Sequence, residues 1–415
     1  MKFPKLTVGP DTTRMLGLGH PWVIADRYTR SWPKGIKSGD LAGLESEDGR
    51  FLGTAMIDPQ DRVVARLIDR EEVRINSDWL GQRLQVAIDL RSCHLDLDET
   101  DAYRIVNAEG DSLPGLVVDR YGDYLLVQTY SECWLPHLPT VVGCLKQQFN
   151  PKGVWHKPRP RQTRNLKTSR EDRDYGKLLL GHSPPQPMQV AERDLRFWVD
   201  LKSGLHTGLF LDQRENRDLF RRHCAGKKVL NLFSYTGAFS VTAAVGGAGQ
   251  VVSVDASTRY MEWSRENFSL NRINPKRHRF EVGDCLAVME QLAVEKEKFD
   301  VVFIDPPSFS STKKGKFSTR KGTSAIIAAS LGLLRPGGLL FASSNHQKTS
   351  AADYLKELRR GALQAGTELR IIHQTSQGAD FPFPVTFPEG SYLKFMVSGK
   401  PDRHFLAKST PPKKK

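Results

Sequence analysis

The most informative segment of this chain is Lys228-Val-Leu-Asn-Leu-Phe-Ser-Tyr-Thr-Gly237. Its apolar first half predicts a buried strand, and its second half predicts a sharp turn into a helix that begins near Ala238. Gly237 lets the backbone come close to a ligand, and the first turn of the helix offers unpaired N–H groups. Taken alone, such a turn is equally typical of ordinary packing in any doubly wound domain.

Three more apolar runs predict buried strands, at residues 250–254, 279–282 and 299–304. Each run is followed closely by an acid, in turn Asp255, Asp284 and Asp305. Strands that alternate with helices form a doubly wound α/β sheet, and such sheets bind ligands at the carboxyl ends of their strands. We therefore expect the three acids to share one ligand site with the turn formed by Phe233, Ser234, Tyr235, Thr236 and Gly237.

Asp255 and Asp284 each allow two interpretations. Asp255 either accepts hydrogen bonds from both hydroxyls of a ribose or caps a helix that runs from Ser257 onward. Asp284 either accepts the amino group of an adenine or caps the helix predicted over residues 286–292. A nicotinamide enzyme would share the Asp255 signal, but the G-x-G-x-x-G fingerprint is missing after the first strand.

The segment Asp305-Pro306-Pro307 discriminates between these classes of protein. Two prolines fix φ at the mouth of the fourth strand, and such a rigid backbone holds a carboxylate and carbonyls beside a reacting group. A Pro-Pro turn that merely caps the strand is the alternative. Because of the order in which these parts follow one another, we interpret the segment as catalytic. That order is the one found in S-adenosylmethionine-dependent methyltransferases.

The charge of the chain favours a polyanionic partner. The 415 residues carry a formal net charge of +14, and basic side chains gain affinity for nucleic acids by releasing counterions from phosphates. The basic residues gather at 152–170 and 313–321. The chain also ends in Lys413-Lys-Lys415, which we interpret as a solvated tail.

Cysteine usage and hydropathy set the expected compartment. The five cysteines are scattered and form no C-x-x-C pair, so neither a disulfide framework nor a metal site is expected. No apolar run approaches the length of a membrane span, and the N-terminus lacks the apolar stretch of a secretory signal. We expect a cytoplasmic protein without a membrane partner.

Four regions are expected along the chain. Residues 1–71 contain short alternating runs separated by turn residues and predict a small mostly-β unit. Residues 72–190 predict a central α/β domain with a basic loop. Residues 191–400 predict the doubly wound domain, and residues 401–415 form a basic tail.

Within the third region we expect two further features. Residues 195–200 and 208–212 read as the two strands of a small hairpin. A proline-rich loop at 378–390 precedes the strand 392–397. We expect this last strand to close the sheet at its edge, running antiparallel to its neighbour.

From about residue 14 to residue 397, the chain resembles bacterial 23S ribosomal RNA methyltransferases with an N-terminal PUA-like domain. The motifs that carry the resemblance are specific in combination: Gly19-His-Pro-Trp22, Asp111-Ser-Leu-Pro-Gly115 with Asp119-Arg-Tyr-Gly122, Thr207-Gly208 with Leu211-Asp-Gln-Arg214, and Phe387-Pro-Glu-Gly390 with Tyr392-Leu-Lys394. The resemblance implies a PUA-like RNA-binding domain, a central α/β domain and a Rossmann-like seven-stranded catalytic domain that uses S-adenosylmethionine. It implies 23S ribosomal RNA or a large-subunit assembly intermediate as the substrate, and it leaves a homodimer open.

The product depends on the residue that follows the fifth strand, residues 338–344. The family includes 5-methylcytosine enzymes, which place there a cysteine that attacks C6 of cytosine; the matching residue here is Asn345. The relatives that make N7-methylguanine carry Asn at this point, and they share stretches similar to 305–314 and 207–212. Guanine N7 has a free lone pair and loses no proton, so alignment and electrostatics can suffice. We expect N7-methylguanine, with 5-methylcytosine as the alternative.

Asp305, Pro306, Pro307 and Asn345 are the expected catalytic residues. Asn345 either binds a base edge or caps the helix near Thr349, and Cys285 is expected to pack rather than to act as the nucleophile. Phe309 and Tyr235 are expected to stack on a flipped base, although Tyr235 also suits the wall of the cofactor pocket. The expected phosphate contacts are Lys313, Lys314, Lys316 and Arg320.

Two other functions are consistent with parts of this pattern. An RNA-binding assembly protein with a vestigial methyltransferase fold would share the basic charge and the PUA-like domain. The intact set of Asp255, Asp284 and Asp305 argues against it, and measured binding of S-adenosylmethionine would discriminate. A small-molecule methyltransferase is disfavoured by the charge and by the PUA-like domain.

Overall fold

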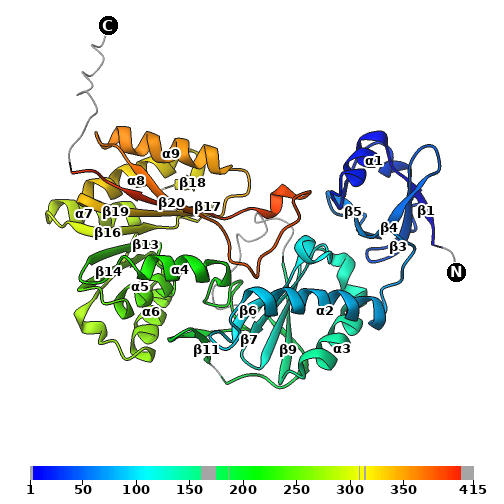
Figure 1. Ribbon diagram of the computed structural model, residues 1–415, viewed down its shortest axis with the longest axis horizontal. Coiled ribbons are helices and arrows are strands. Elements are labelled where there is room, and N and C mark those ends of the chain that lie inside the picture. The colour runs from blue at the N-terminus through cyan, green and yellow to red at the C-terminus, as the bar shows by residue number, and fades with distance from the viewer. Residues whose placement is uncertain (1–2, 160–173, 186, 308, 313–314, 403–415) are drawn as a thin grey trace, which may run out of the picture. The chain divides into compact units, whose positions relative to one another are not determined.

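The computed structural model describes residues 3–159, 174–185, 187–307, 309–312 and 315–402. The chain forms two compact units (Figure 1). Unit 1 comprises Met1–Asp194, Val199–Leu211 and Ala379–Gly390, and unit 2 comprises Leu195–Trp198, Asp212–Gly378 and Ser391–Lys415. In the part of the chain that is described, no helix combines the length and apolar character that crossing a bilayer requires.

Unit 1 begins with a five-stranded sheet that has its own apolar core. The strands follow the order β1-β3-β4-β5-β2 and comprise β1 (Lys5–Thr7), β2 (Trp22–Ile24), β3 (Leu41–Glu45), β4 (Phe51–Ile57) and β5 (Val63–Asp69). One short helix, α1 (Pro10–Gly17), lies between the first two strands in sequence, and Pro10 occupies its first position, where no N–H is needed. The N-terminal sequence is therefore mostly β, as predicted.

A second five-stranded sheet completes the framework of unit 1. Its order is β10-β9-β8-β7-β6, with β6 (Ala102–Asn107), β7 (Leu116–Tyr121), β8 (Tyr124–Thr129), β9 (Gly153–Pro158) and β10 (Lys177–Gly181). Helices α2 (Ser77–His94) and α3 (Leu138–Phe149) share one apolar core with these strands, through residues such as Leu84 and Leu145. The α2 helix begins where the Asn76 side chain accepts a hydrogen bond from Trp79 N at 2.9 Å.

Unit 2 is the doubly wound domain that the sequence predicts. Seven strands lie in the order β15-β14-β13-β16-β19-β21-β20: β13 (Lys228–Leu232), β14 (Gln250–Asp255), β15 (Arg279–Val282), β16 (Phe299–Ile304), β19 (Leu334–Ser344), β20 (Arg370–Thr375) and β21 (Lys394–Gly399). The first five in this order are parallel. Such strands read as continuous apolar runs because both of their faces are covered.

Helices cover both faces of this sheet, as Figure 1 shows. On one face lie α4 (Arg214–Arg221), α5 (Ala238–Val245) and α6 (Thr258–Leu270). On the other lie α7 (Cys285–Val294), α8 (Thr319–Leu333) and α9 (Ala351–Gln364). The core between this second group and the sheet contains Leu232, Ile304 and Leu358 among its buried side chains.

Two of the local expectations for this region are wrong. The last strand, β21, is antiparallel as predicted, but it pairs with both β19 and β20, so the edge is β20. Every residue of β20 from 370 to 374 is exposed. The strand therefore lacks the apolar run by which the buried strands were predicted. Residues 208–212 form no strand, because Gly208 has φ +101° and the chain turns into a 3-10 helix at Leu211–Gln213.

Candidate active site

The candidate site lies where the order of the parallel strands reverses. Strand β13 pairs with β14 on one side and with β16 on the other, and Leu232 lies opposite Ile304 in the ladder. The turn after β13 and the Asp305 segment after β16 therefore leave the same edge of the sheet side by side. This switch point is where doubly wound sheets bind ligands, so the structure brings together the two motifs that the sequence singled out.

The turn after β13 adopts a strained backbone. Phe233, Tyr235 and Gly237 have φ values of +59°, +51° and +79°, and the first two are not glycine. A positive φ strains a residue other than glycine, and strain of this kind concentrates at functional sites. A Cβ on Gly237 would lie 2.0 Å from Ser264 Oγ, so only glycine fits at the start of α5.

Asp255 holds this turn in place. Its half-buried carboxylate accepts hydrogen bonds from Tyr235 N at 2.9 Å and from Ser257 N at 3.0 Å. Burial raises the pKa of Asp255, and the backbone N–H groups act in the opposite direction. The helix cap of α6 is Ser257, whose side chain accepts from Tyr260 N. The interpretation of Asp255 as a simple cap for this helix is therefore wrong.

Asp284 does cap a helix. Its Oδ1 accepts from Leu286 N at 3.1 Å and from Ala287 N at 3.3 Å, at the start of α7. This leaves its expected contact with an adenine as a proposal. The next residue, Cys285, is 5% exposed and belongs to the apolar core, where burial raises the pKa of its thiol to about 12. Cys285 packs, as predicted, and is held as a neutral thiol.

Asp305 directly follows β16 and lies within a polar cluster. Gln213 Nε2 lies 3.4 Å from Asp305 Oδ2 and donates to Ser343 Oγ at 2.9 Å. Burial, followed by the negative charge of Asp212, raises the pKa of Asp305 to about 7, although hydrogen bonds from Ser343 and Gln213 favour the carboxylate. Asp212 in turn accepts a hydrogen bond from Tyr392 Oη at 2.7 Å. Asp305 thus titrates near neutral pH.

Asn345 is exposed directly after the last residue of β19. It does not cap the following helix, because the cap of α9 is Ser350, whose side chain accepts from Asp353 N at 3.0 Å. His346 is half-buried and its Nδ1 lies 2.8 Å from Thr349 Oγ1. The cap interpretation of Asn345 is therefore wrong, and its contact with a base edge stays a prediction.

The segment after β19 is fastened by Lys394 of β21. The Lys394 ammonium is buried and donates to the carbonyl oxygens of His346 at 2.7 Å and Tyr392 at 2.6 Å. Burial lowers the pKa of Lys394 to about 8. Lys394 also stands opposite Ser344 in the ladder, so it fixes the backbone on which Asn345 sits.

Sequence reasoning missed Asp212, Gln213, Ser343, Tyr392 and Lys394 as members of the site. Four of them lay within motifs that carry the family resemblance but were given no chemical role, and Ser343 lay in the fifth strand. Their chemical roles depend on contacts between residues far apart in the chain.

Other predicted site residues are only partly described. The ring of Tyr235 lies edge-on to that of Tyr260, with centroids 4.4 Å apart. Lys313 and Lys314 lie outside the described residues. Phe309, Lys316 and Arg320 lie in β17 (Phe309–Thr312), β18 (Gly315–Ser318) and α8, where the described features are limited to the backbone.

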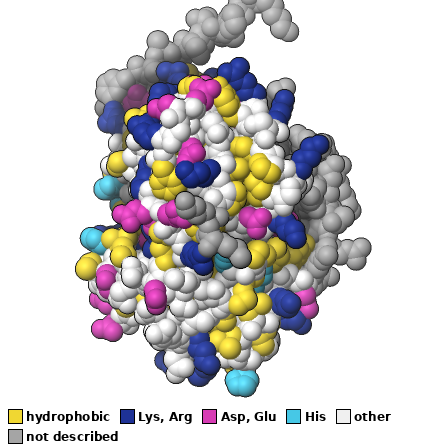
Figure 2. Space-filling view, turned by 90° about the vertical axis from the view of Figure 1, so that its right-hand side faces the viewer, with side chains coloured by type: hydrophobic (Ala, Val, Ile, Leu, Met, Phe, Trp, Pro, Cys, Tyr) yellow, Lys and Arg dark blue, Asp and Glu magenta, His cyan; other side chains and the backbone are white. Residues whose placement is uncertain are grey.

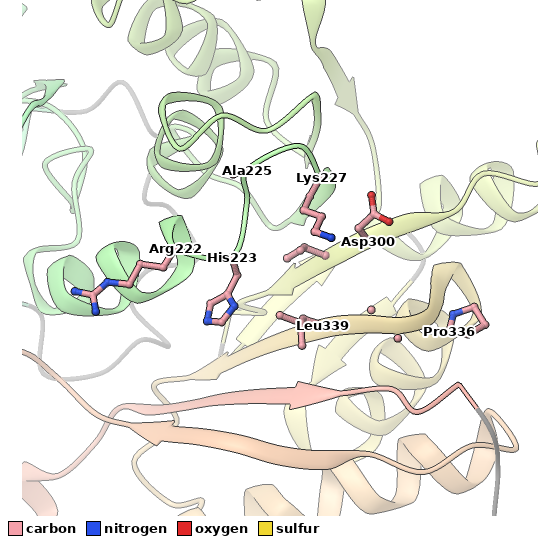
Figure 3. Close-up of a pocket in the computed structure, with 10 residues that line it drawn as sticks. Arg222, His223, Ala225, Lys227, Asp300, Pro336 and Leu339 are labelled. Carbon is pink, nitrogen blue, oxygen red and sulfur yellow. The ribbon is translucent and has the colours of Figure 1, made fainter.

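A pocket of about 440 Å³ lies at the opposite edge of the sheet, near the amino ends of β13 and β16 (Figure 3). Its lining residues include Arg222, His223, Lys227, Asp300, Pro336 and Leu339. Asp300 is already paired with Arg335 at 2.6 Å and accepts from Lys228 N. None of the predicted site residues lines this pocket, so it is separate from the switch point.

The chain matches known families over most of its length. A family model of S-adenosylmethionine-dependent methyltransferases matches residues 109–390, and a PUA-like domain model matches residues 6–70. The ribosomal RNA large subunit methyltransferase I of Klebsiella pneumoniae is 31% identical over 396 residues, which are 94% of this chain and 97% of the relative. The protein of the same name from Erwinia tasmaniensis is 30% identical over 90% of this chain and 94% of its own.

Solved structures give the same assignment of fold. A protein described as a methyltransferase and crystallised in complex with SAH has a TM-score of 0.85 and is 29% identical, covering 95% of this chain and 100% of its own. A SAM-dependent methyltransferase from Streptococcus mutans has a TM-score of 0.83 with the same identity and coverage.

Proposed function

The chain belongs to the S-adenosylmethionine-dependent methyltransferase family, and we propose that it methylates a base of 23S ribosomal RNA. The PUA-like match at residues 6–70 and the ribosomal RNA named for the curated relatives support this substrate. The net charge of +14 supports a polyanion in general. In Figure 2, Lys and Arg side chains are spread over the visible face among acidic and apolar ones.

The residues at the switch point fit S-adenosylmethionine, the cofactor of the family. The cofactor combines an adenosine with a positively charged sulfonium. The Asp255 carboxylate accepts hydrogen bonds from Tyr235 N at Oδ2 and from Ser257 N at Oδ1. A carboxylate has about four lone-pair sites, so it can also accept a ribose hydroxyl. Asp305 offers a carboxyl group beside the strained turn, where a cation would favour its ionised form. When bound, the cofactor supplies the methyl group, and these residues hold and orient it.

N7-methylguanine is the product that we propose, with 5-methylcytosine as the alternative. Covalent attack on cytosine needs a thiolate beside the methyl group, and an amide such as Asn345 cannot attack C6. Four of the five cysteines are buried, and the exposed one, Cys93, lies in α2 of unit 1. The raised pKa of Cys285 further opposes a relocated nucleophile. Alignment of guanine N7 with the methyl group requires no covalent step.

Mass spectrometry of nucleosides tests the proposal. Large-subunit ribosomal RNA that lacks the modification is incubated with the protein and labelled S-adenosylmethionine, and the labelled nucleoside is identified. We expect labelled N7-methylguanosine from the wild type and from Cys285→Ala. Labelled 5-methylcytidine that disappears in Cys285→Ala would overturn the product and assign Cys285 as the nucleophile. Binding of S-adenosylmethionine without any labelled nucleoside would favour the vestigial assembly protein instead.

A further inference from the structure

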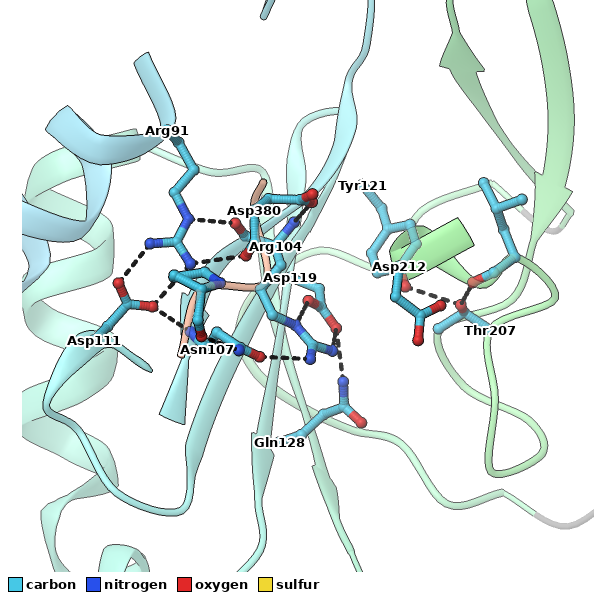
Figure 4. A network of polar contacts seen from close by, with 12 residues as sticks. Arg91, Arg104, Asn107, Asp111, Asp119, Tyr121, Gln128, Thr207, Asp212 and Asp380 are labelled. Atoms are coloured by element: carbon cyan, nitrogen blue, oxygen red, sulfur yellow. Dashed lines mark hydrogen bonds and ion pairs between the residues drawn. The ribbon is translucent and has the colours of Figure 1, made fainter. Parts of the chain in front are cut away.

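The loop between β20 and β21, residues 379–390, belongs to unit 1 and is anchored there at its first end. Asp380 is fully buried; its carboxylate accepts from Arg104 N at 3.0 Å, and its carbonyl accepts from Arg91 Nη2 at 2.8 Å. The Arg104 guanidinium lies 4.3 Å from the centre of the Phe381 ring. Asn107 Nδ2 donates to Pro382 O at 2.8 Å. Figure 4 shows Arg91, Arg104 and Asn107 converging on this segment.

The second end of the loop is anchored on the PUA-like region. Phe387 is 4% exposed, and its ring centroid lies 5.2 Å from that of His20 and 4.8 Å from that of Trp22. Thr386 packs so closely on Gly19, which has φ +93°, that a Cβ there would come within 2.9 Å of it. Two of the motifs that carry the family resemblance, at 19–22 and 387–390, therefore pack against each other.

Between the two anchors the loop presents an apolar tip, Phe383-Pro384-Val385. Val385 is 94% exposed and Phe383 is 38% exposed. Prolines at 382, 384 and 388 restrict φ, and Phe387 N donates to Pro384 O at 2.9 Å across a turn. A single exposed valine needs no explanation. Here, however, two buried anchors and three prolines fix the tip in advance, which lowers the entropic cost of binding through it.

We propose that this tip contacts the substrate RNA and inserts its apolar side chains between two stacked bases. The inference rests on the proposed function, because enzymes that modify a base take it out of the stack, and apolar wedges stabilise the opened step. Phe383 offers a stacking surface for one base, for which a single ring is enough. A stable protein partner would need an interface of about 1,000 Å², far more than three side chains supply.

The test compares tip variants with a matched surface variant. Phe383→Ala/Val385→Ser removes the tip, and Val294→Ser changes a valine that is 83% exposed at the end of α7. We expect the tip variant to lower kcat/KM for ribosomal RNA at least tenfold, with unchanged affinity for S-adenosylmethionine and unchanged Tm. Val294→Ser should match the wild type in all three. With 2-aminopurine placed in turn at positions along the RNA, the wild type should raise the fluorescence at a position where the tip variant does not.

The other outcomes overturn the inference in distinguishable ways. An active wild type with an equally active tip variant would refute the wedge and leave the proposed function standing. Asp380→Asn weakens the first anchor and serves as the reference for a structural defect. If the tip variant loses activity with a similar fall in Tm, the loop has only a structural role. A loss seen only with assembled ribosomal particles, and not with naked RNA, would assign the tip to a protein contact. A wild type that methylates no ribosomal RNA would remove the proposed function and the wedge together.

Discussion

At the scale of single residues, Asp305 combines burial with a second acid nearby. The negative charge of Asp212 and the loss of solvent both favour the protonated carboxyl, while Gln213 and Ser343 donate hydrogen bonds that only partly compensate. An acid held in this way is poised to ionise when a cation arrives. The positively charged cofactor of the family is such a cation, so binding and titration should be linked.

We predict that S-adenosylmethionine binds more tightly as the pH rises from 6 to 8. The pKa of Asp305 is raised to about 7 in the free protein, and the cation favours the carboxylate, so binding releases a proton below pH 7. For that pKa the affinity should rise roughly tenfold over this range. Calorimetry in two buffers of different ionisation enthalpy measures both the affinity and the released proton.

Asp305→Asn is the control for this linkage. The asparagine cannot ionise, so the remaining pH dependence reports the cofactor's own groups and the rest of the protein. The difference between wild type and variant isolates Asp305. Identical pH profiles in the two proteins would show that Asp305 does not face the cofactor.

At the scale of elements, the turn from β13 into α5 is shaped by one glycine and one packed serine. Gly237 requires a left-handed backbone and also lies against Ser264 of α6. The effect of the left-handed backbone can be separated from the effect of the close contact. Gly226 has a similar φ of +70°, and a Cβ there would meet no atom of a packed neighbour within 4 Å.

We predict that Gly237→Ala costs more stability than Gly226→Ala and also weakens cofactor binding. Gly226→Ala should cost about 1 kcal/mol, from the left-handed backbone alone. Gly237→Ala adds the clash with Ser264 Oγ at 2.0 Å, so we expect a further 1–3 kcal/mol, roughly the penalty for overpacking. Urea unfolding gives both values. If Ser264→Gly does not recover part of the loss in the double variant, the clash is not the cause.

A buried ion pair connects α2 to the turn that follows β6. Arg91 and Asp111 have side chains that are 1% and 4% exposed, and Arg91 Nη1 lies 2.5 Å from Asp111 Oδ1. Figure 4 shows that Arg91 also reaches Asp380. Arg91 therefore satisfies groups from two distant segments of the chain.

We predict that Arg91→Met destabilises the protein by about 3–5 kcal/mol, because it leaves the Asp111 carboxylate buried without its partner. The control is Arg222→Met, which removes an ion pair with Asp218 whose arginine is 72% exposed and should cost about 0–1 kcal/mol. Both are measured by urea unfolding. Equal losses in the two variants would contradict the idea that burial decides the cost.

At the scale of the whole molecule, the excess of 14 positive charges favours RNA of any sequence, while the switch point and its loops decide the chemistry. The contribution of each basic stretch is measurable as a slope against salt. Three lysines can be replaced by alanine in the stretch 313–321 and three in the C-terminal tail. Both variants lose three positive charges, so each serves as a control for the other.

We predict that replacing Lys313, Lys314 and Lys316 by Ala weakens RNA binding for all sequences alike. Each phosphate contact contributes about 0.7–0.9 to the slope of log K against log salt, so the slope should flatten by roughly 2–3. Replacing Lys413, Lys414 and Lys415 removes the same charge from the tail and should change the slope little. Filter binding across a salt series checks both, and equal slopes for the two triple variants would refute a special role for the first stretch.

The doubly wound class, the strands β13 to β16 and the residues at their carboxyl ends could be predicted before any contact was known. Apolar periodicity, Gly237 and the Pro-Pro segment are local signals, readable from neighbours in the chain. The parallel arrangement then follows from the alternation of strands and helices, and so does the meeting of Phe233 and Asp305 at one edge.

The partners that complete the site and the positions of the last strands depend on contacts between distant segments. Tyr392 and Asp212 are 180 residues apart, and no local pattern announces their 2.7 Å hydrogen bond or the raised pKa of Asp305 that Asp212 reinforces. The exposed β20 lacks the apolar run that marks a buried strand, so its edge position was invisible. Contacts and strand positions of this kind depend on how distant segments pack together. Local residue type and spacing do not reveal that packing.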